Sequence, residues 1–328
     1  MNLVGDMNWL TPQWQRLTAY VQSGRVPQAL LLVGREGVGK AQLAEAFSKR
    51  LLCREPQEYA CGECASCRLF AAKTHPDFLR IEPEEAGKAI SVDAVRALKA
   101  NLALKPQYSG RRVVYISPAH QMNVSSANSL LKTLEEPDEH TTLLLLTDSP
   151  ELLPVTILSR CQRMNLPIPD RSLAITWLKK QGLAENVEVL LTLSRGAPFK
   201  ALNLANDGMI EKREEFFNAW LGLTKQDEPA TVAEKWSKFA CETLVDWMIS
   251  WAMDLIRLRS APRNQSIDNL DYIERLLPLA QKLNLKRMFE YLDRLNTGRK
   301  LLLGQVNRQL LLEEVLILWL KCQPKVKN

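Results

Sequence analysis

A glycine-rich turn between an apolar strand and a helical segment restricts the fold of this chain more than any other feature. It follows the apolar run 29–33, precedes a helical pattern that extends to Leu52, and reads Gly34-Arg35-Glu36-Gly37-Val38-Gly39-Lys40-Ala41. In the order strand, turn and helix, the pattern G-x-x-x-x-G-K is typical of a loop that binds phosphate. Its glycines bring backbone N–H groups close to the anion, and the helix N-terminus adds a favourable dipole. The predicted phosphate-binding residues are Gly34, Gly37, Gly39 and Lys40.

Two metal contacts that ATP hydrolysis requires are missing from the sequence. The residue after the lysine is normally Ser or Thr, whose hydroxyl holds Mg²⁺, and here it is Ala41. A second apolar strand, 113–116, is the place where an acidic metal ligand is expected, but it ends in Ser117-Pro118. We therefore expect no intrinsic ATPase, while ATP binding is left open. The alternative is an ATP-hydrolysing enzyme whose metal is held by other groups, with Ser117 offering one hydroxyl.

The order of elements predicts an α/β fold with a parallel, doubly wound sheet. Apolar strands at 29–33, 78–81, 113–116 and 142–147 alternate with helical segments, and the sheet should end near Leu166. Pro167-Ile168-Pro169 indicates a linker. After it we expect helices only, at 171–180, 185–194, 198–206, 209–223, 231–259, 268–283, 285–302 and 306–321.

The C-terminal helices should be buried on several sides. Apolar residues cover more than one face of the last one, at Leu310, Leu311, Leu312, Val315, Leu316, Leu318 and Trp319. Trp236, Trp247, Trp251 and Trp319 are expected in the core.

Four of the seven cysteines form a pattern that predicts a structural metal site. No apolar run reaches 18 residues, so we expect a cytoplasmic protein, in which disulfides are rare. Cys53, Cys61, Cys64 and Cys67 have the spacing C-x₇-C-x₂-C-x₂-C, which suits a closed tetrahedral Zn²⁺ site. Two alternatives remain: His75 as a ligand in place of Cys53, or four buried cysteines without metal. Cys161, Cys241 and Cys322 should not contribute.

A zinc-dependent DNA-binding module is a further reading of the cysteine segment. The net charge of +6 permits a polyanionic partner without requiring one. The only basic residue between the cysteines is Arg54, which is poor provision for contacts with phosphates.

Two longer motifs carry a resemblance to a known family. They are Asn128-Ser129-Leu130-Leu131-Lys132-Thr133-Leu134-Glu135-Glu136-Pro137 and Leu153-Pro154-Val155-Thr156-Ile157-Leu158-Ser159-Arg160-Cys161. With the cysteine module between residues 53 and 67, they resemble the AAA+ subunits of the bacterial DNA polymerase III clamp loader. The likeness is strong over about residues 25–165. It is weaker through Ser194-Arg195-Gly196 and Asn307–Leu312.

Within that family the chain resembles the delta-prime subunits, which do not hydrolyse ATP, more than the motor subunits. The motors' lid arginine falls on Phe199, with Lys200 one place away. Ser159-Arg160-Cys161 resembles the segment that presents an arginine finger to the ATP of a neighbouring subunit, so Arg160 is expected to act in trans.

The resemblance also implies domains and partners. The domains would be an AAA+ P-loop domain at 1–167 with an inserted zinc module at 53–67, an all-α lid at 168–207, and an all-α collar at 208–328 that joins subunits into a ring. The implied partners are gamma/tau-type ATPase subunits, a delta-type subunit, the sliding clamp and primed DNA. The chain would thus be an accessory subunit of a DNA polymerase holoenzyme.

Overall fold

The computed structural model describes residues 6–85, 87–108, 110–136, 140–224, 227–260, 267–302, 304 and 306–323. Contacts divide the chain into two compact units, one of residues 1–187 and 193–203 and the other of residues 188–192 and 204–328. Each unit is described by itself. Among the described residues, no helix combines the length and apolar character needed to cross a membrane.

The first unit is built on a five-stranded parallel sheet with the order β2-β3-β4-β1-β5. The strands are β1 (Ala29–Val33), β2 (Phe78–Ile81), β3 (Arg112–Ile116), β4 (Thr141–Thr147) and β5 (Gln162–Asn165). Leu31 pairs with Leu145 on one side and with Arg163 on the other. Because β1, β3 and β4 are buried along their whole length, they read as continuous apolar runs, as expected for a sheet covered on both faces.

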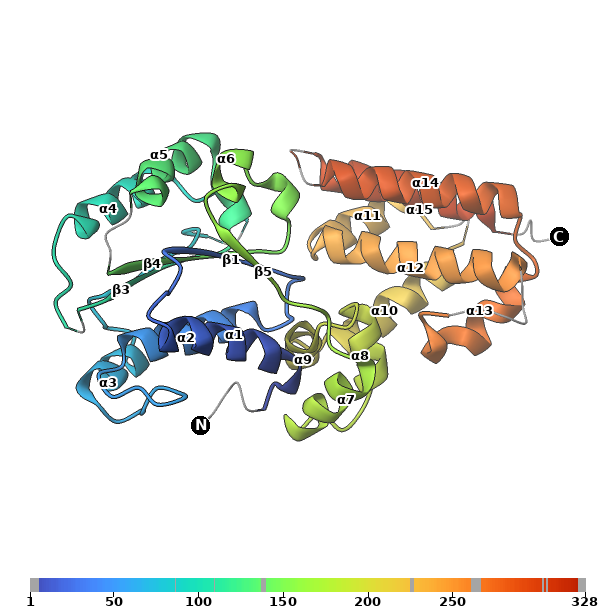
Figure 1. Ribbon diagram of the computed structural model, residues 1–328. Coiled ribbons are helices and arrows are strands. Elements are labelled where there is room, and N and C mark those ends of the chain that lie inside the picture. Colours follow the sequence, from blue (N-terminus) through green and yellow to red (C-terminus); the bar gives the residue numbers. More distant parts are fainter. Residues whose placement is uncertain are drawn as a thin grey trace. The chain divides into compact units, whose positions relative to one another are not determined.

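Helices cover both faces of this sheet (Figure 1). One layer holds η1 (Asn8–Leu10), α1 (Thr11–Gln22), α2 (Lys40–Leu52) and α3 (Ala65–Ala71). The other holds α4 (Val92–Leu102), α5 (Val124–Glu135) and α6 (Val155–Leu158), with the short turns η2 (Ala119–Gln121) and η3 (Pro150–Leu152). Leu130 and Leu134 of α5 pack with Val95 and Leu98 of α4 in one core against the sheet. Pro137, in the first resemblance motif, lies outside the described residues.

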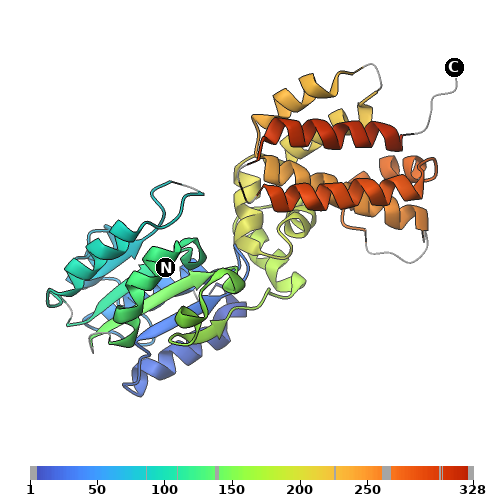
Figure 2. The ribbon, with the colours of Figure 1, turned by 90° about the horizontal axis from the view of Figure 1, so that it is seen from above.

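Where the structure describes the chain after β5, it contains helices and no strand, as predicted from the sequence. They are α7 (Arg171–Lys180), α8 (Val187–Leu193), α9 (Pro198–Asn206), α10 (Met209–Gly222), α11 (Pro229–Ser237), α12 (Cys241–Ser260), η4 (Leu270–Tyr272), α13 (Ile273–Ala280), α14 (Leu285–Leu301) and α15 (Arg308–Cys322). In the second unit, α12, α14 and α15 run alongside one another (Figure 2).

The predicted single helix at 231–259 is wrong: the chain forms α11 and α12 with a turn between them. The reason is an aromatic cluster. Phe216 contacts Trp236 at a ring-centroid distance of 5.3 Å and Trp247 at 6.2 Å. In one straight helix these tryptophans, eleven residues apart, would be separated by about 16 Å, so one ring could not reach both.

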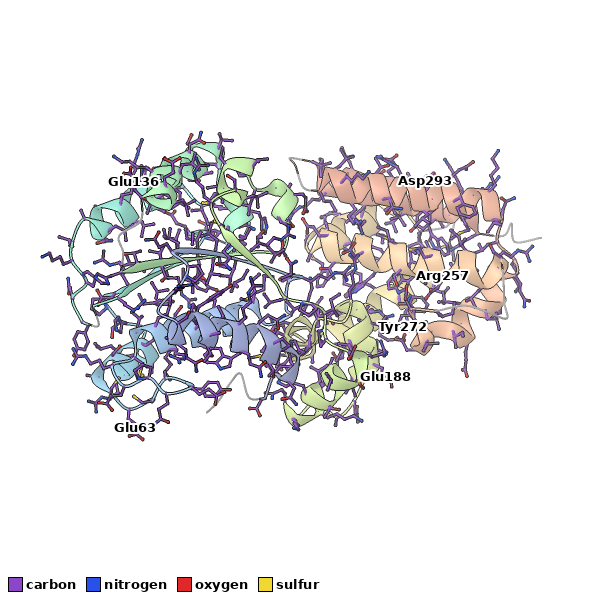
Figure 3. All side chains as sticks on the ribbon, in the orientation of Figure 1. Glu63, Glu136, Glu188, Arg257, Tyr272 and Asp293 are labelled. Carbon is purple, nitrogen blue, oxygen red and sulfur yellow. The ribbon has the colours of Figure 1, made fainter. Side chains whose placement is uncertain are left out.

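A buried polar network explains a second difference, since the predicted helix at 268–283 begins only at Ile273. The Asp254 carboxylate is fully buried and accepts the backbone N–H of Asn269 at 2.8 Å. It also accepts from Arg257 at 2.9 Å, and Arg257 and Tyr272 mark this region in Figure 3. These contacts hold Asp268 and Asn269 in a non-helical course, and the turn η4 follows them, so α13 begins only at Ile273.

The predicted tryptophans lie in the core of the second unit. Trp236, Trp247, Trp251 and Trp319 are all buried, and Trp319 stacks on Trp220 at 3.8 Å. In α15, Leu311, Leu312, Val315, Leu316 and Trp319 are buried. Leu310 is 62% exposed in this chain, so α15 has an apolar position that its own unit leaves uncovered.

Candidate functional site

The phosphate loop, residues 34–40, connects β1 to α2 at the carboxyl ends of the parallel strands. Gly37 and Gly39 have φ angles of +79° and +107°, which side chains rarely adopt. At Gly34 a Cβ atom would lie 2.7 Å from the carbonyl oxygen of Leu166. All three glycines are therefore needed for the backbone course, whether or not the loop holds an anion.

Lys40 folds back onto its own loop. Its Nζ donates to the carbonyl oxygen of Gly34 at 2.6 Å and to that of Arg35 at 2.9 Å. Burial lowers the pKa of Lys40, while the charges of Asp148 and Glu36 act in the opposite direction. The ammonium group that should contact a terminal phosphate is instead engaged by backbone carbonyls.

The segment around α9 covers the loop from one side. The backbone N–H of Phe199 donates to the carbonyl oxygen of Gly37 at 2.9 Å. A Cβ atom on Gly37 would lie 2.5 Å from the backbone nitrogen of Lys200. Lys200 Nζ forms an ion pair with Glu36 at 2.7 Å. Phe199 and Lys200 are the two candidate positions for the lid arginine, and neither side chain presents a positive charge to the inside of the loop.

The N-terminal segment fills the other side of the loop. Trp9 donates its indole N–H to the carbonyl oxygen of Val38 at 2.9 Å. A Cβ atom on Gly39 would lie 2.9 Å from Leu10 Cδ1 and 3.3 Å from the ring of Phe199. Trp177 contacts both Trp9, at 5.6 Å, and Phe199, at 4.6 Å. Aromatic and aliphatic side chains of the chain itself occupy the space beside the glycines.

The strand ends offer little to a metal ion. Ala41 has no ligand atom, and β3 runs directly into Ser117-Pro118. Burial raises the pKa of Tyr115, and the Ser117 hydroxyl, the one candidate ligand named from the sequence, acts in the opposite direction. One of the two carboxylates whose charges act on Lys40 is Asp148, directly after β4, which sequence reasoning missed. The sequence signal that could have identified Asp148 was an acidic residue directly after an apolar strand. Asp148 Oδ1 accepts from Ser149 Oγ at 2.8 Å.

The four predicted cysteines meet in one cluster, at the loop marked by Glu63 in Figure 3. Their sulfur atoms all lie within 4.8 Å of one another. The Sγ–Sγ distances from Cys53 to Cys61 and to Cys64 are 3.5 and 4.0 Å, and that from Cys61 to Cys67 is 3.9 Å. Four thiolates around Zn²⁺, with bonds of about 2.3 Å, would be about 3.8 Å apart. The donor set therefore fits a tetrahedral metal ion.

Backbone hydrogen bonds support this arrangement of sulfurs. The N–H groups of Cys61, Cys64 and Cys67 donate to the Sγ atoms of Cys53, Cys61 and Cys64 at 3.4, 3.3 and 3.4 Å. Gly62, with a φ of +82°, makes the turn between Cys61 and Cys64. Burial tends to raise the pKa of Cys64, but hydrogen bonds to its sulfur bring that pKa down to about 6. Such donors stabilise the thiolate form that binds metal.

His75 lies outside the cysteine cluster and serves a different network. Its Nε2 is 2.8 Å from Ser66 Oγ, and its Nδ1 accepts the backbone N–H of Asp77 at 3.1 Å. With Nδ1 as acceptor, the neutral ring carries its proton on Nε2 and donates to Ser66, which donates to the carbonyl oxygen of Leu52 at 2.5 Å. This Ser-His-Asp grouping therefore cannot take a proton from the serine, and it serves to fasten the cysteine loop to the end of α2.

Two further contacts fasten the cysteine loop. Tyr59 stacks on Trp14 of α1 at 5.0 Å. Arg54 donates to the carbonyl oxygen of Tyr108 at 2.9 Å and lies 4.4 Å above that ring. The one basic residue between the cysteines is thus engaged within the chain, which weighs against the reading of this loop as a DNA-binding module.

The remaining cysteines lie apart from the cluster of Cys53, Cys61, Cys64 and Cys67. Cys241 and Cys322 are buried, and Cys161 packs partly buried beside the core under α5. Burial raises the pKa values of the Cys161 and Cys322 thiols to about 11. These three residues pack as small apolar groups, as expected from the sequence.

Arg160 lies near the start of the strands, at the opposite end from the phosphate loop. β5 begins at Gln162, which pairs with Leu30 at the start of β1, whereas the loop follows the end of β1. Four residues of extended chain, from Leu30 to Gly34, separate the two levels by about 13 Å, and Arg160 precedes Gln162 by two further residues, so it lies away from the loop of its own chain. Its guanidinium is one-third exposed and forms an ion pair with Glu135.

Comparisons with known proteins agree on one family. The family model described as DNA polymerase III, delta subunit matches residues 9–170, and that of its C-terminal region matches residues 207–321. DNA polymerase III subunit delta' of Pseudomonas aeruginosa is 37% identical over 318 residues, covering 95% of this chain and 96% of the relative. The Escherichia coli subunit delta' is 31% identical, covering 94% of this chain and 93% of the relative.

Two more distant matches are also named after subunits of DNA polymerase III. DNA polymerase III subunit tau/gamma of Haemophilus influenzae is 37% identical over 153 residues, 46% of this chain and 22% of the relative. The solved structure of a DNA polymerase III gamma subunit-related protein from Thermotoga maritima matches over 94% of this chain and 99% of that protein, at 18% identity and a TM-score of 0.49.

Proposed function

The chain belongs to the delta-prime family of DNA polymerase III subunits, and we therefore propose that it is a clamp-loader subunit that does not hydrolyse ATP and supplies an arginine to a neighbour that does. Its partners in this proposal are gamma/tau-type ATPase subunits and a delta-type subunit in one ring. Together they load the sliding clamp onto primed DNA.

The observation that carries the first half of the proposal is the filled phosphate loop. Lys40 is bound to the loop's own carbonyls, Phe199 donates to Gly37, and Trp9 donates to Val38. A nucleotide would have to displace all three contacts before its phosphates reached the backbone N–H groups. It would gain no metal contact in return from Ala41 or from the end of β3.

Without a metal ion the reaction itself also lacks support. Phosphoryl transfer depends on cations that neutralise the charge developing on the γ-phosphate. Lys200, the nearest lid cation, is paired with Glu36. The competing proposal of an ATP-hydrolysing enzyme would need Ser117 to hold the metal ion and a carboxylate to replace the one missing after β3.

The second half of the proposal concerns Arg160. Its distance from its own phosphate loop and its exposed position favour a ligand outside this chain. A guanidinium is permanently charged and can contact two phosphate oxygens at once, which suits the γ-phosphate of a neighbour's ATP.

We also propose structural roles for the rest of the chain. One Zn²⁺ held by Cys53, Cys61, Cys64 and Cys67 would leave no position for water, so its role is to staple the loop between α2 and α3. Residues 168–207 would form a lid and residues 208–328 a collar that binds the other subunits.

Two measurements test the function. The purified chain should neither bind a non-hydrolysable ATP analogue in calorimetry nor turn over ATP with Mg²⁺. ATP turnover by the pure chain that disappears in Lys40→Ala would refute the first half. In the assembled complex, Arg160→Ala should lower clamp- and DNA-stimulated ATPase by the share of one site. Arginine fingers contribute roughly 10³–10⁵ in rate at the site they serve. Unchanged ATPase and clamp loading would refute the second half.

A further inference from the structure

We propose that Glu135 is a positioning residue that holds the Arg160 guanidinium ready for the neighbour's nucleotide. The inference rests on the role in trans proposed for Arg160 and adds a second residue to it. Glu135 belongs to the first of the two sequence motifs noted above and Arg160 to the second. The contact between these side chains is where the two motifs meet.

Three acceptors from two helical segments hold the guanidinium. Arg160 Nη2 lies 2.6 Å from Glu135 Oε1 at the end of α5. Arg160 Nη1 donates to the carbonyl oxygen of Thr156 at 3.0 Å and to Ser159 Oγ at 3.4 Å. Thr156 lies in α6 and Ser159 is its cap residue. The first contact joins α5 to the turn after α6, and the other two are local.

The position of Glu135 is not explained by the stability of its own helix. It is the last residue of α5, and Glu136 follows as the cap. The C-terminus of a helix carries partial negative charge, so an acidic side chain there is unfavourable. The Arg160 guanidinium offsets this charge, which ties the acid at this position to the arginine and not to helix formation.

The geometry favours positioning over restraint. A guanidinium has five N–H groups, and the three contacts use at most three of them. The ion pair joins Glu135 Oε1 to Arg160 Nη2. A bidentate pair would occupy the fork that two phosphate oxygens require, whereas the hydrogen bonds of Arg160 to Thr156 and Ser159 both come from Nη1, which leaves N–H groups available. Fixing the long side chain in advance lowers the entropy lost when it contacts phosphate.

The test uses the assembled complex with three variants of this chain. Glu135→Gln removes the charge and keeps the shape, and Glu135→Lys replaces attraction by repulsion. Glu136→Gln is the matched control, since the ion pair and hydrogen bonds of Arg160 with described residues involve Glu135, Thr156 and Ser159 and not the adjacent Glu136, which is labelled in Figure 3. Thermal stability and complex assembly are measured for each variant, followed by clamp- and DNA-stimulated ATPase as a function of ATP concentration.

We expect Glu135→Gln to slow turnover at the one affected site about two- to fivefold, the factor that corresponds to about 0.4–1 kcal/mol for an exposed ion pair. Arg160→Ala defines that site's share of the total rate, and Glu135→Gln should remove about half to four fifths of it. Glu135→Lys should approach the full loss. The maximal rate should fall while the KM for ATP, thermal stability and assembly stay unchanged. In the Arg160→Ala background neither Glu135 variant should have a further effect.

The outcomes separate this inference from the proposed function. If Arg160→Ala has no effect, the role of Arg160 in trans fails. If Arg160→Ala lowers the rate but Glu135→Gln and Glu135→Lys match Glu136→Gln, only the positioning role fails. Faster turnover with Glu135→Gln would show that the acid restrains the arginine, and it would overturn the inference too. Loss of activity in the Arg160→Ala background would assign Glu135 a separate role and count equally against it.

Discussion

Replacement of Lys40 by alanine should lower the stability of this protein without lowering the activity of its complex. In an ATP-binding loop the same change removes the contact to the terminal phosphates and abolishes turnover. Here the Lys40 ammonium donates to the carbonyls of Gly34 and Arg35, inside the loop itself. The loss is therefore structural, because both carbonyls lose a partner.

The size of the effect follows from these two hydrogen bonds. Hydrogen bonds to a charged group contribute about 1.5–3 kcal/mol each. Burial lowers the pKa of Lys40, which means that desolvation of the ammonium offsets part of this gain. We expect a net loss of about 1–2 kcal/mol in the free energy of unfolding. For a unit of this size that corresponds to a decrease of about 2–8 °C in Tm.

The assay pairs thermal unfolding of the isolated chain with ATPase of the reconstituted complex at a temperature where every variant is folded. Lys40→Met is the control, since it keeps most of the apolar stem and removes only the donors. It should account for most of the decrease in Tm that Lys40→Ala causes. ATPase and clamp loading should equal those of the unmodified complex. A variant with unchanged Tm and a complex that has lost activity would refute the reasoning, because Lys40 would then be acting on a nucleotide.

Three further outcomes are expected. Elemental analysis should find one zinc per chain, and Cys67→Ser should lose it together with thermal stability; metal-free protein after gentle purification would contradict the site. Burial lowers the pKa of His75, so the folded chain binds fewer protons than the unfolded chain below about pH 6.5. The stability that is present above that pH is therefore lost as the pH falls. With zinc in excess, His75→Gln should flatten this pH dependence of stability, and an unchanged profile would exclude His75 as its source. Leu310→Asp should leave the Tm of the isolated chain unchanged but weaken assembly with partner subunits, whereas Leu270→Asp, at a similarly exposed position of the same unit, should not; equal effects would argue against a collar contact at Leu310.

Four of the sheet's five strands could be predicted closely because they are short apolar runs with clear ends, whereas β5, with the sequence Gln-Arg-Met-Asn, was not among the predicted strands. β1 and β2 have the predicted bounds, 29–33 and 78–81, and β3 and β4 differ by one residue at their starts. The cysteine cluster was equally accessible, since its four ligands lie within fifteen positions and their spacing alone restricts the geometry. In both cases the information is local in the sequence.

The errors came from contacts between distant residues. Phe216 draws Trp236 and Trp247 together and so breaks a helix that looked continuous. Asp254 holds the backbone at Asn269 and delays the start of α13. The filling of the phosphate loop by Trp9 and Phe199 joins segments far apart in the chain, and no local pattern marked either residue for that place.

The same contacts account for a phosphate loop that keeps its glycines and lysine but lacks its metal ligands. Gly37 must be glycine because the backbone of Lys200 lies against it, and Gly39 because Leu10 and Phe199 do. Lys40 closes the loop through the carbonyls of Gly34 and Arg35. Each retained residue therefore has a packing role that needs no nucleotide, whereas Ala41 and Ser117 stand where only metal-dependent chemistry would require other residues. The residues that match the phosphate-loop motif are thus those that packing requires, and the residues that depart from it are those that only ATP hydrolysis would require.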